Sequence, residues 1–303
     1  MTSRFDRLLI AFAAVMVAAP SAAGAMEKAV ARITSFGGTC EKCDLSGRKL
    51  SGARFMGANF SGAALVGSDL RDAKFIGSDF SGADLSRADL SDASMTGANF
   101  NNANLSNAQL RAAEARGVSF RAANLSQANL SDAEATGATF AGARLRDTVL
   151  RAAAVSGASF SGADLSRADL RDLTAHGANF RGASAAGANF ADAALQGAVL
   201  SGGQFDRASF RSAELQGAVL TGSSFDGANF ADASLRRTMI GGVDLSKARG
   251  LDQDQLDAAC GDSRTRVPSG LVVRNCPGGP RIAAPFPPIP RPPAPPAPPT
   301  PPR

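Results

Sequence analysis

Residues 81–90 read S-G-A-D-L-S-R-A-D-L, and the same ten letters return at residues 161–170. Each stretch holds two five-residue units in which a small residue, a polar residue and a leucine follow one another. Outward from these stretches the leucine position recurs every five residues from Leu45 to Leu245, and 34 of its 41 positions hold Leu or Phe. The others are Met95, Ala115, Ala135, Val155, Ala175, Ala185 and Ile240. We name this series the large column, and the mostly Ala series two residues before it the small column.

A period of five residues matches neither an α-helix, with 3.6 residues per turn, nor a strand, whose side chains alternate every two residues. It is typical of a chain that turns a corner every five residues. Glycine often stands two residues after the large column, as at Gly57, Gly62 and Gly97, where it eases such a turn. One large and one small side chain then point inward from each side, because two large ones would overfill a narrow core.

The sequence also repeats with a longer period of 20 residues, which is four units of five. Phe55, Phe60, Leu65 and Leu70 are followed by Phe75, Phe80, Leu85 and Leu90. One of these series continues as a predicted core ladder of Phe100, Phe120, Phe140, Phe160 and Phe180. Four sides per coil would give this superperiod, with like residues stacked at roughly the 4.8 Å spacing of paired strands. We therefore predict an all-β, four-sided β-solenoid of about ten coils and about 50 Å in length.

Two irregularities interrupt the 20-residue pattern. After Phe180 the series of Phe and Leu shifts by ten residues, or half a coil, so that Phe160 and Phe210 are predicted on different sides. We interpret the shift as the join of an internal duplication or deletion. The large column is also thin over Met95, Ala115, Ala135, Val155 and Ala175. Because a cavity left by a Leu-to-Ala truncation costs roughly 2–5 kcal/mol, we expect the Phe rings at 100–180 to lean into this space; a ligand pocket is the alternative.

The units at 81–90 and 161–170 resemble the A(D/N)Lxx signature of the pentapeptide-repeat family, over about two-thirds of the chain. The resemblance implies a right-handed quadrilateral β-helix with the Leu and Phe residues inside, but it does not imply one function. The best-known members resemble DNA in shape and acidic charge and protect DNA gyrase in the cytoplasm. This chain departs from them, because residues 44–250 hold 21 Lys and Arg against 20 Asp and Glu and because it carries a predicted export signal.

That export signal is predicted at residues 1–25. Arg4 and Arg7 precede an apolar run from Leu8 to Ala19, and residues 23–25 fit an A-x-A cleavage site. The run is shorter than the roughly 20 residues that span a bilayer, so we prefer a cleaved signal to an uncleaved anchor. The signal predicts a periplasmic or secreted protein with no transmembrane segment after cleavage.

Both ends of the solenoid need caps, because an open end exposes strand edges and core. We predict an N-terminal cap at 26–43 with a short strand at 29–35, the solenoid at 44–250, and a C-terminal cap at 251–276. The C-terminal cap begins with a predicted helix at 251–259, for which Asp252 is the expected N-cap.

The four cysteines stand in two pairs, Cys40 with Cys43 and Cys260 with Cys276. A disulfide requires Cα atoms within roughly 7 Å, whereas the two ends are about 50 Å apart. Within one chain only Cys40–Cys43 and Cys260–Cys276 are therefore possible, and both agree with an oxidising compartment. The CxxC spacing of Cys40 and Cys43 also occurs in redox proteins and metal sites. We prefer a structural disulfide, since no thioredoxin-like βαβ pattern surrounds the pair and zinc would need two further ligands.

Residues 277–303 are rich in proline and cannot form a core. We predict a disordered tail, extended as polyproline II over up to about 80 Å at 3.1 Å per residue. The tail either acts as a spacer or docks, with Arg281, Arg291 and Arg303 meeting an acidic envelope surface or partner.

One charged pattern on the outward positions is regular. Arg71, Arg111, Arg151, Arg171 and Arg211 share one position in the 20-residue period, beside Asp72, Asp92, Asp132, Asp172, Asp192 and Asp232. They are predicted to form one charged stripe. Because exposed ion pairs add only roughly 0–1 kcal/mol of stability, the stripe serves solubility or faces a partner.

No outward residue is predicted to be catalytic, and neither a metal nor a cofactor is expected. His176 is the only histidine and follows a core position, so it is expected at the solvated surface. A near-neutral rod lacks the clustered cations that nucleic-acid binding needs. The sequence thus predicts a non-enzymatic, exported structural or protein-interaction scaffold with an unknown protein or envelope partner and an unspecified oligomeric state. The alternatives are a thiol–disulfide redox protein using Cys40 and Cys43 and, less favoured, a DNA mimic that protects gyrase.

Overall fold

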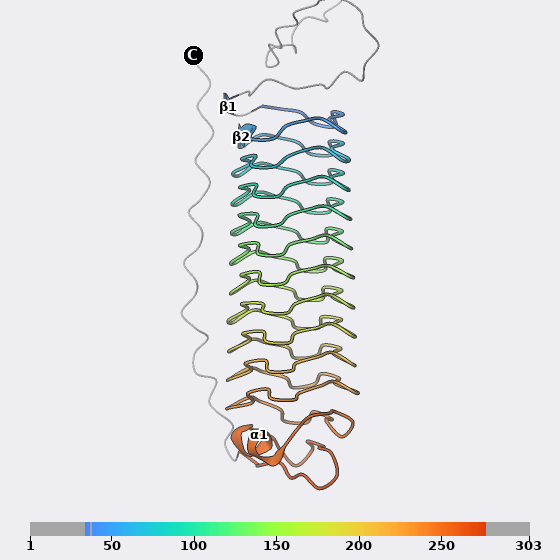
Figure 1. The fold of residues 1–303 in the computed structure, drawn as a ribbon, viewed down its shortest axis with the longest axis vertical. Coiled ribbons are helices and arrows are strands. Elements are labelled where there is room, and N and C mark those ends of the chain that lie inside the picture. The colour runs from blue at the N-terminus through green and yellow to red at the C-terminus, as the bar shows by residue number, and fades with distance from the viewer. Residues whose placement is uncertain (1–33, 37, 277–303) are drawn as a thin grey trace, which may run out of the picture.

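The computed structural model describes residues 34–36 and 38–276. The chain winds as a stack of coils, from β1 (Thr34–Phe36) and β2 (Arg54–Met56) at one end to α1 (Gln253–Ala258) at the other (Figure 1). The predicted signal at 1–25, most of the predicted strand at 29–35 and the predicted tail at 277–303 lie outside the described residues. Within the described part, no helix has the length and apolar character needed to cross a membrane.

Successive coils pair in parallel at a separation of 20 residues. The bridges run without interruption of this register from Thr39↔Asn59 to Asn229↔Arg249, and every fifth residue takes part in one. This confirms the superperiod predicted from the sequence. Few segments qualify as strands, because a turn after every large residue leaves one paired residue between corners. The described chain is thus a β-helix with one short terminal α-helix.

Backbone hydrogen bonds follow one rule from coil to coil. Leu65 N–H donates to the carbonyl of Asp84 at 2.7 Å, and Asp84 N–H donates back to Ala63 at 2.9 Å. Ala63 N–H also closes the β-turn onto Phe60 at 3.0 Å. Repeated along the chain, this rule pairs most buried backbone groups with the next coil, as a packed interior requires.

The third residue of each turn adopts a positive φ, from Lys42 to Gly242 at intervals of five. This explains why glycine recurs two residues after the large column. Nineteen of these turn residues are nevertheless not glycine. Asp and Asn tolerate this left-handed conformation better than most residues, whereas Ala112, Ala122 and Ala152 hold it against its usual steric cost.

The core consists of the large and small columns. From Phe60 to Leu245 every residue of the large column is at most 2% exposed, so the interior is filled from end to end. The predicted Phe ladder is present: neighbouring rings from Phe100 to Phe180 stack with centroids 4.7–5.3 Å apart. The stack continues back through Phe80 to Phe60, the earlier members of the same series.

The half-coil shift after Phe180 is also visible in the structure. Phe160 stacks on Phe180 in one series, while Phe210 stacks on Phe190 and Phe230 in another. The two series meet where the Phe180 and Phe190 rings pack edge to face at 5.8 Å. Phe160 and Phe210 therefore lie in different columns, as predicted.

The thin part of the large column is closed to solvent. Its residues Met95, Ala115, Ala135, Val155 and Ala175 are each at most 1% exposed. The Phe rings beside them stack in parallel, and their leaning into this space stays a prediction.

Both ends of the solenoid are covered. β1 pairs with β2 in parallel, with Thr34 opposite Arg54. At the other end Asp252 caps α1 in a capping box with Gln255, which confirms the predicted N-cap. The Gln255 side chain donates to the carbonyls of Phe230 and Ala233 at 2.8 and 2.9 Å, and Leu256 is fully buried over the last coil.

Candidate functional site

The four cysteines form the two predicted pairs. The Cα atoms are 5.3 Å apart in Cys40–Cys43 and 5.4 Å apart in Cys260–Cys276, and both pairs are disulfide-bonded. None of the four is free. Cys40 is only 8% exposed, so a thiolate from another protein would have little access to its sulfur.

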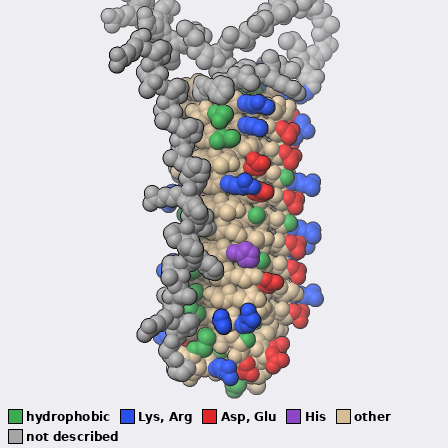
Figure 2. All heavy atoms as spheres, turned by 90° about the vertical axis from the view of Figure 1, so that its left-hand side faces the viewer, with side chains coloured by type: hydrophobic (Ala, Val, Ile, Leu, Met, Phe, Trp, Pro, Cys, Tyr) green, Lys and Arg blue, Asp and Glu red, His purple; other side chains and the backbone are tan. Residues whose placement is uncertain are grey.

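Each arginine of the charged stripe predicted from the sequence lies within ion-pair distance of an aspartate. Figure 2 shows basic and acidic side chains alternating along one edge of the solenoid. Arg111, Arg151 and Arg211 reach Asp132, Asp172 and Asp232 in the next coil, with N–O distances of 3.5, 3.2 and 3.9 Å. The other two arginines pair with a residue of their own coil: Arg71 with Asp69 at 2.7 Å and Arg171 with Asp169 at 2.6 Å.

The aspartates of the stripe have a second, local explanation. Asp72, Asp92, Asp132, Asp172, Asp192 and Asp232 all occupy the positive-φ position of a turn, with φ between 58° and 62°. Asp is one of the few non-glycine residues that adopt this conformation readily. Turn geometry therefore accounts for their recurrence, whereas it does not account for the recurring arginines beside them.

A second wall of the solenoid carries almost no charge. We name it the Asn59 wall and count it from Asn59, which itself pairs with Thr39 at the N-terminal end; bridges join its members in successive coils. It consists of Asn59, Asp79, Asn99, Ser119, Thr139, Ser159, Asn179, Val199, Val219 and Met239. Asp79 is its only charged residue, and glycine fills most of the turns on either side. Sequence reasoning did not single out this wall, although its members are spaced by 20 residues like those of the stripe.

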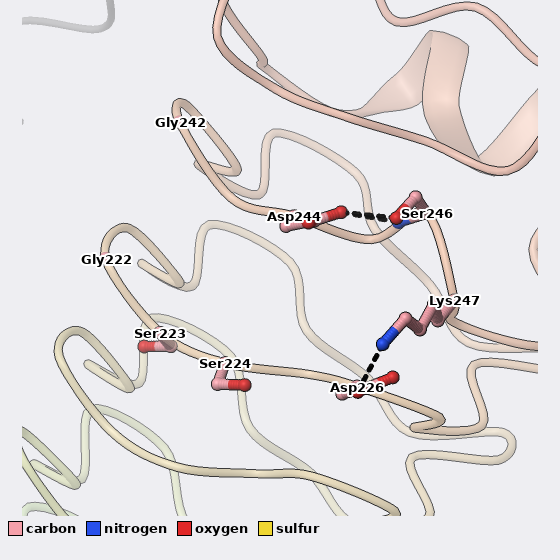
Figure 3. Close-up of a pocket in the computed structure, with 8 residues that line it drawn as sticks. All are labelled: Gly222, Ser223, Ser224, Asp226, Gly242, Asp244, Ser246 and Lys247. Atoms are coloured by element: carbon pink, nitrogen blue, oxygen red, sulfur yellow. Dashed lines mark hydrogen bonds and ion pairs between the residues drawn. The ribbon is translucent and has the colours of Figure 1, made fainter.

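A polar groove opens between the last two coils, near the C-terminal cap (Figure 3). It has a volume of roughly 430 Å³ and is lined by Gly222, Ser223, Ser224, Asp226, Gly242, Asp244, Ser246 and Lys247. Phe205 N–H donates to Ser224 at 2.8 Å, but within these described coils Phe225 makes no matching bond to Asp244. The bridge Ser224↔Asp244 still joins the two coils here, and the small column holds Val243 where the preceding coils hold Gly203 and Ser223.

Four polar side chains of the groove bond to one another in two pairs. Lys247 donates to Asp226 at 2.8 Å, and this bond raises the pKa of the Lys247 ammonium. Ser246 donates to Asp244, and this contact lowers the pKa of the Asp244 carboxyl. Both groups therefore stay charged at neutral pH, which suits neither a nucleophilic lysine nor an acid catalyst.

The hydroxyl of Ser223 is also hydrogen-bonded: it donates to the backbone carbonyl of Leu200 at 2.7 Å. A serine nucleophile needs an adjacent base to take its proton, and a backbone carbonyl is not such a base. His176 lies elsewhere, exposed at a corner as predicted. Among the described residues no group of three or more His, Cys, Asp or Glu side chains could hold a metal ion.

Two family models match the repeat region. The model described as a pentapeptide repeat region matches residues 68–137, and the model described as pentapeptide repeats (8 copies) matches residues 40–77, 148–184, 176–211, 188–225 and 213–249. The chain belongs to the pentapeptide-repeat family. In this pentapeptide-repeat protein the matched residues are the coils whose large column fills the core.

Solved structures of other pentapeptide-repeat proteins are similar to this one. HetL from the cyanobacterium Nostoc, involved in heterocyst differentiation regulation, is 32% identical over 63% of this chain and 88% of its own, with a TM-score of 0.35. Full-length QnrB1, a plasmid-mediated fluoroquinolone resistance protein, is 20% identical over 76% of this chain and 92% of its own, with a TM-score of 0.19. A protein of the Arabidopsis thaliana thylakoid lumen is 27% identical over 42% of this chain and 70% of its own, with a TM-score of 0.14. No curated protein matches the chain.

Proposed function

We propose that this pentapeptide-repeat protein is an exported, non-enzymatic structural or protein-interaction scaffold, periplasmic or secreted. Its solenoid is a right-handed, four-sided β-helix of about ten coils at roughly 4.8 Å per coil. The observation that carries the proposal is the filled interior, in which the large column is at most 2% exposed from Phe60 to Leu245. Enzyme sites are usually concave and partly enclosed, whereas a filled rod offers its outer walls.

Two further observations support the proposal. Disulfides at both ends suit an oxidising compartment outside the cytoplasm. The stripe arginines are ion-paired but remain exposed, with 44–69% of each side chain accessible. Because such pairs contribute only about 0–1 kcal/mol each, a partner with acidic groups can replace the aspartates at little cost.

The test is capture of a partner from the cell envelope by cross-linking. We expect the full chain to capture a defined protein, and replacement of Arg111, Arg151 and Arg211 by Glu to lower the yield at least about tenfold. The matched control carries three Glu residues on the Asn59 wall, at Ser119, Thr139 and Ser159, and should keep the yield. The proposal is wrong if the full chain captures only what an unrelated exported protein captures.

Two further experiments test the role of the tail and the redox alternative. A chain ending at Cys276 shows whether residues 277–303 recruit the partner, since an unchanged yield would make the tail a spacer. Titration of the native protein with a thiol reagent tests Cys40 and Cys43. We expect no reaction, whereas a thiol pair that cycles with a redox partner would favour the redox function.

A further inference from the structure

The end of the Asn59 wall forms an apolar strip. Val199, Val219 and Met239 pair in register in successive coils, and each is partly exposed. Across residues 44–249, no other outward column places three large apolar side chains in successive coils. Elsewhere in this range large apolar side chains on the outer surface stand singly or in twos, as Met56 and Ile76 do, so the strip is the longest such run.

The described chain ends beside this strip. Met239 pairs with Cys260, which is disulfide-bonded to Cys276. Cys276 N–H also donates to the carbonyl of Gly261 at 3.4 Å. Residue 277 thus begins within about one coil of Met239, at the end of the strip.

We propose that the proline-rich segment 277–303 of this same chain docks along the Asn59 wall, with its apolar residues on the strip. Apart from proline and alanine, the apolar residues of this segment are Ile282, Phe286 and Ile289. Polyproline II has three residues per turn, so Phe286 and Ile289 share a face and lie about 9 Å apart. Val199 and Met239 are two coils apart, which is about 10 Å at roughly 4.8 Å per coil. The two apolar patterns therefore match in spacing.

The length of segment 277–303 and the cost of removing charged groups from water also favour docking of this segment on the strip. Gly278 and Gly279 follow the disulfide directly and allow the chain to reverse toward the strip. The 27 residues of the segment span up to about 80 Å as polyproline II, which exceeds the length of the wall. Docking on the strip removes no ionic group from water, whereas docking on the charged stripe would desolvate its arginines and aspartates. The docking is independent of whether the scaffold binds a partner.

Amide NMR of the full chain with both disulfides intact tests the contact. Replacing Phe286→Ser and Ile289→Ser should shift the resonances of Val199, Val219 and Met239 and leave Asn189, Ser209 and Asn229, half a coil away, unchanged. The matched control, Ala294→Ser with Ala297→Ser in the same segment, should shift the strip at least about threefold less. An unchanged strip, or equal shifts on all walls, would overturn the proposal and leave the strip to a foreign protein.

A second measurement separates this chain's own segment from that of a second copy. With no other cysteine free, a nitroxide on Ala283→Cys labels the segment alone. Within one chain the label should broaden the amides of the strip. In a mixture of nitroxide-labelled chains with isotope-labelled chains that lack the nitroxide, the strip should stay sharp. Broadening in the mixture would assign the strip to a second copy and overturn the proposal.

Discussion

Gly203 lies against the ring of Phe205: a Cβ atom added to Gly203 would stand 2.6 Å from Phe205 Cε2 and 3.0 Å from the carbonyl oxygen of Ala183. Two coils earlier the same pair of positions holds Ala163 and Leu165. At this one side of the coil the small column holds no side-chain carbon beside a phenylalanine. Elsewhere the phenylalanines keep a larger neighbour, as Phe120 does with Val118, so the constraint is local to Gly203 and Phe205.

Replacing Gly203→Ala should overpack the core. The Phe205 ring is fully buried and the added Cβ would stand 2.6 Å from it, so we expect a loss of about 1–3 kcal/mol in the free energy of unfolding. Urea denaturation measures this loss. Adding Phe205→Leu, which recreates the pair Ala163 and Leu165, should recover part of it, and a neutral Gly203→Ala variant would show that the ring is not confined.

The Phe ladder and the thin column should show the same coupling. Ala135→Leu alone should overpack by about 1–3 kcal/mol, and Phe140→Leu alone should leave unfilled space. Leu195 and Leu200 already coexist after the half-coil shift. We therefore expect the double variant to be more stable than the sum of the single changes predicts, by at least about 0.5 kcal/mol. Additive losses would mean that the Phe140 ring does not reach the space beside Ala135.

Glycine at a strained turn should stabilise the solenoid. Ala152 has a φ of 56°, and this left-handed conformation costs a residue other than glycine roughly 1–2 kcal/mol. We expect Ala152→Gly to raise the free energy of unfolding by up to about 1 kcal/mol, because part of the gain is lost to chain entropy. Ala141→Gly is the matched control, since Ala141 is a turn residue without a positive φ, and it should be neutral or destabilising. Equal effects of the two changes would count against the turn geometry.

Acid should loosen the C-terminal cap through Asp262. This carboxylate binds the Arg264 guanidinium and accepts Gly242 N–H at 2.8 Å, and these contacts lower the pKa of Asp262 to about 2. Because the pKa in the folded state lies below the unfolded value of about 4, the contacts stabilise the cap fully above pH 4. Their contribution fades as the pH falls from about 4 through about 2.

The Asp262→Asn variant separates this contribution from those of the other carboxylates. Its melting temperature should fall less than that of the natural chain between pH 6 and pH 2.5. If the two chains lose the same amount, Asp262 does not carry the acid sensitivity of the cap.

Much of the fold follows from the spacing of the large residues. The recurrence of Phe60, Phe80 and Phe100 predicted the 20-residue register, and the distance between the two cysteine pairs left one pairing. The groove beside Val243 could not be predicted, because it depends on how the side chains of two particular coils pack next to the C-terminal cap. The aspartates of the stripe recur partly for their turn geometry, which a charge pattern does not reveal. The Asn59 wall was not predicted, because it lacks the charged residues by which an interaction surface is recognised in a sequence.

The most direct test of the exported scaffold is the intact mass of the protein recovered from a Gram-negative host that expresses it from Met1. We predict a chain that begins at Met26, lies in the periplasm or the medium, and has all four cysteines oxidised. A chain that retains Met1 in the cytoplasm with reduced cysteines would contradict the account.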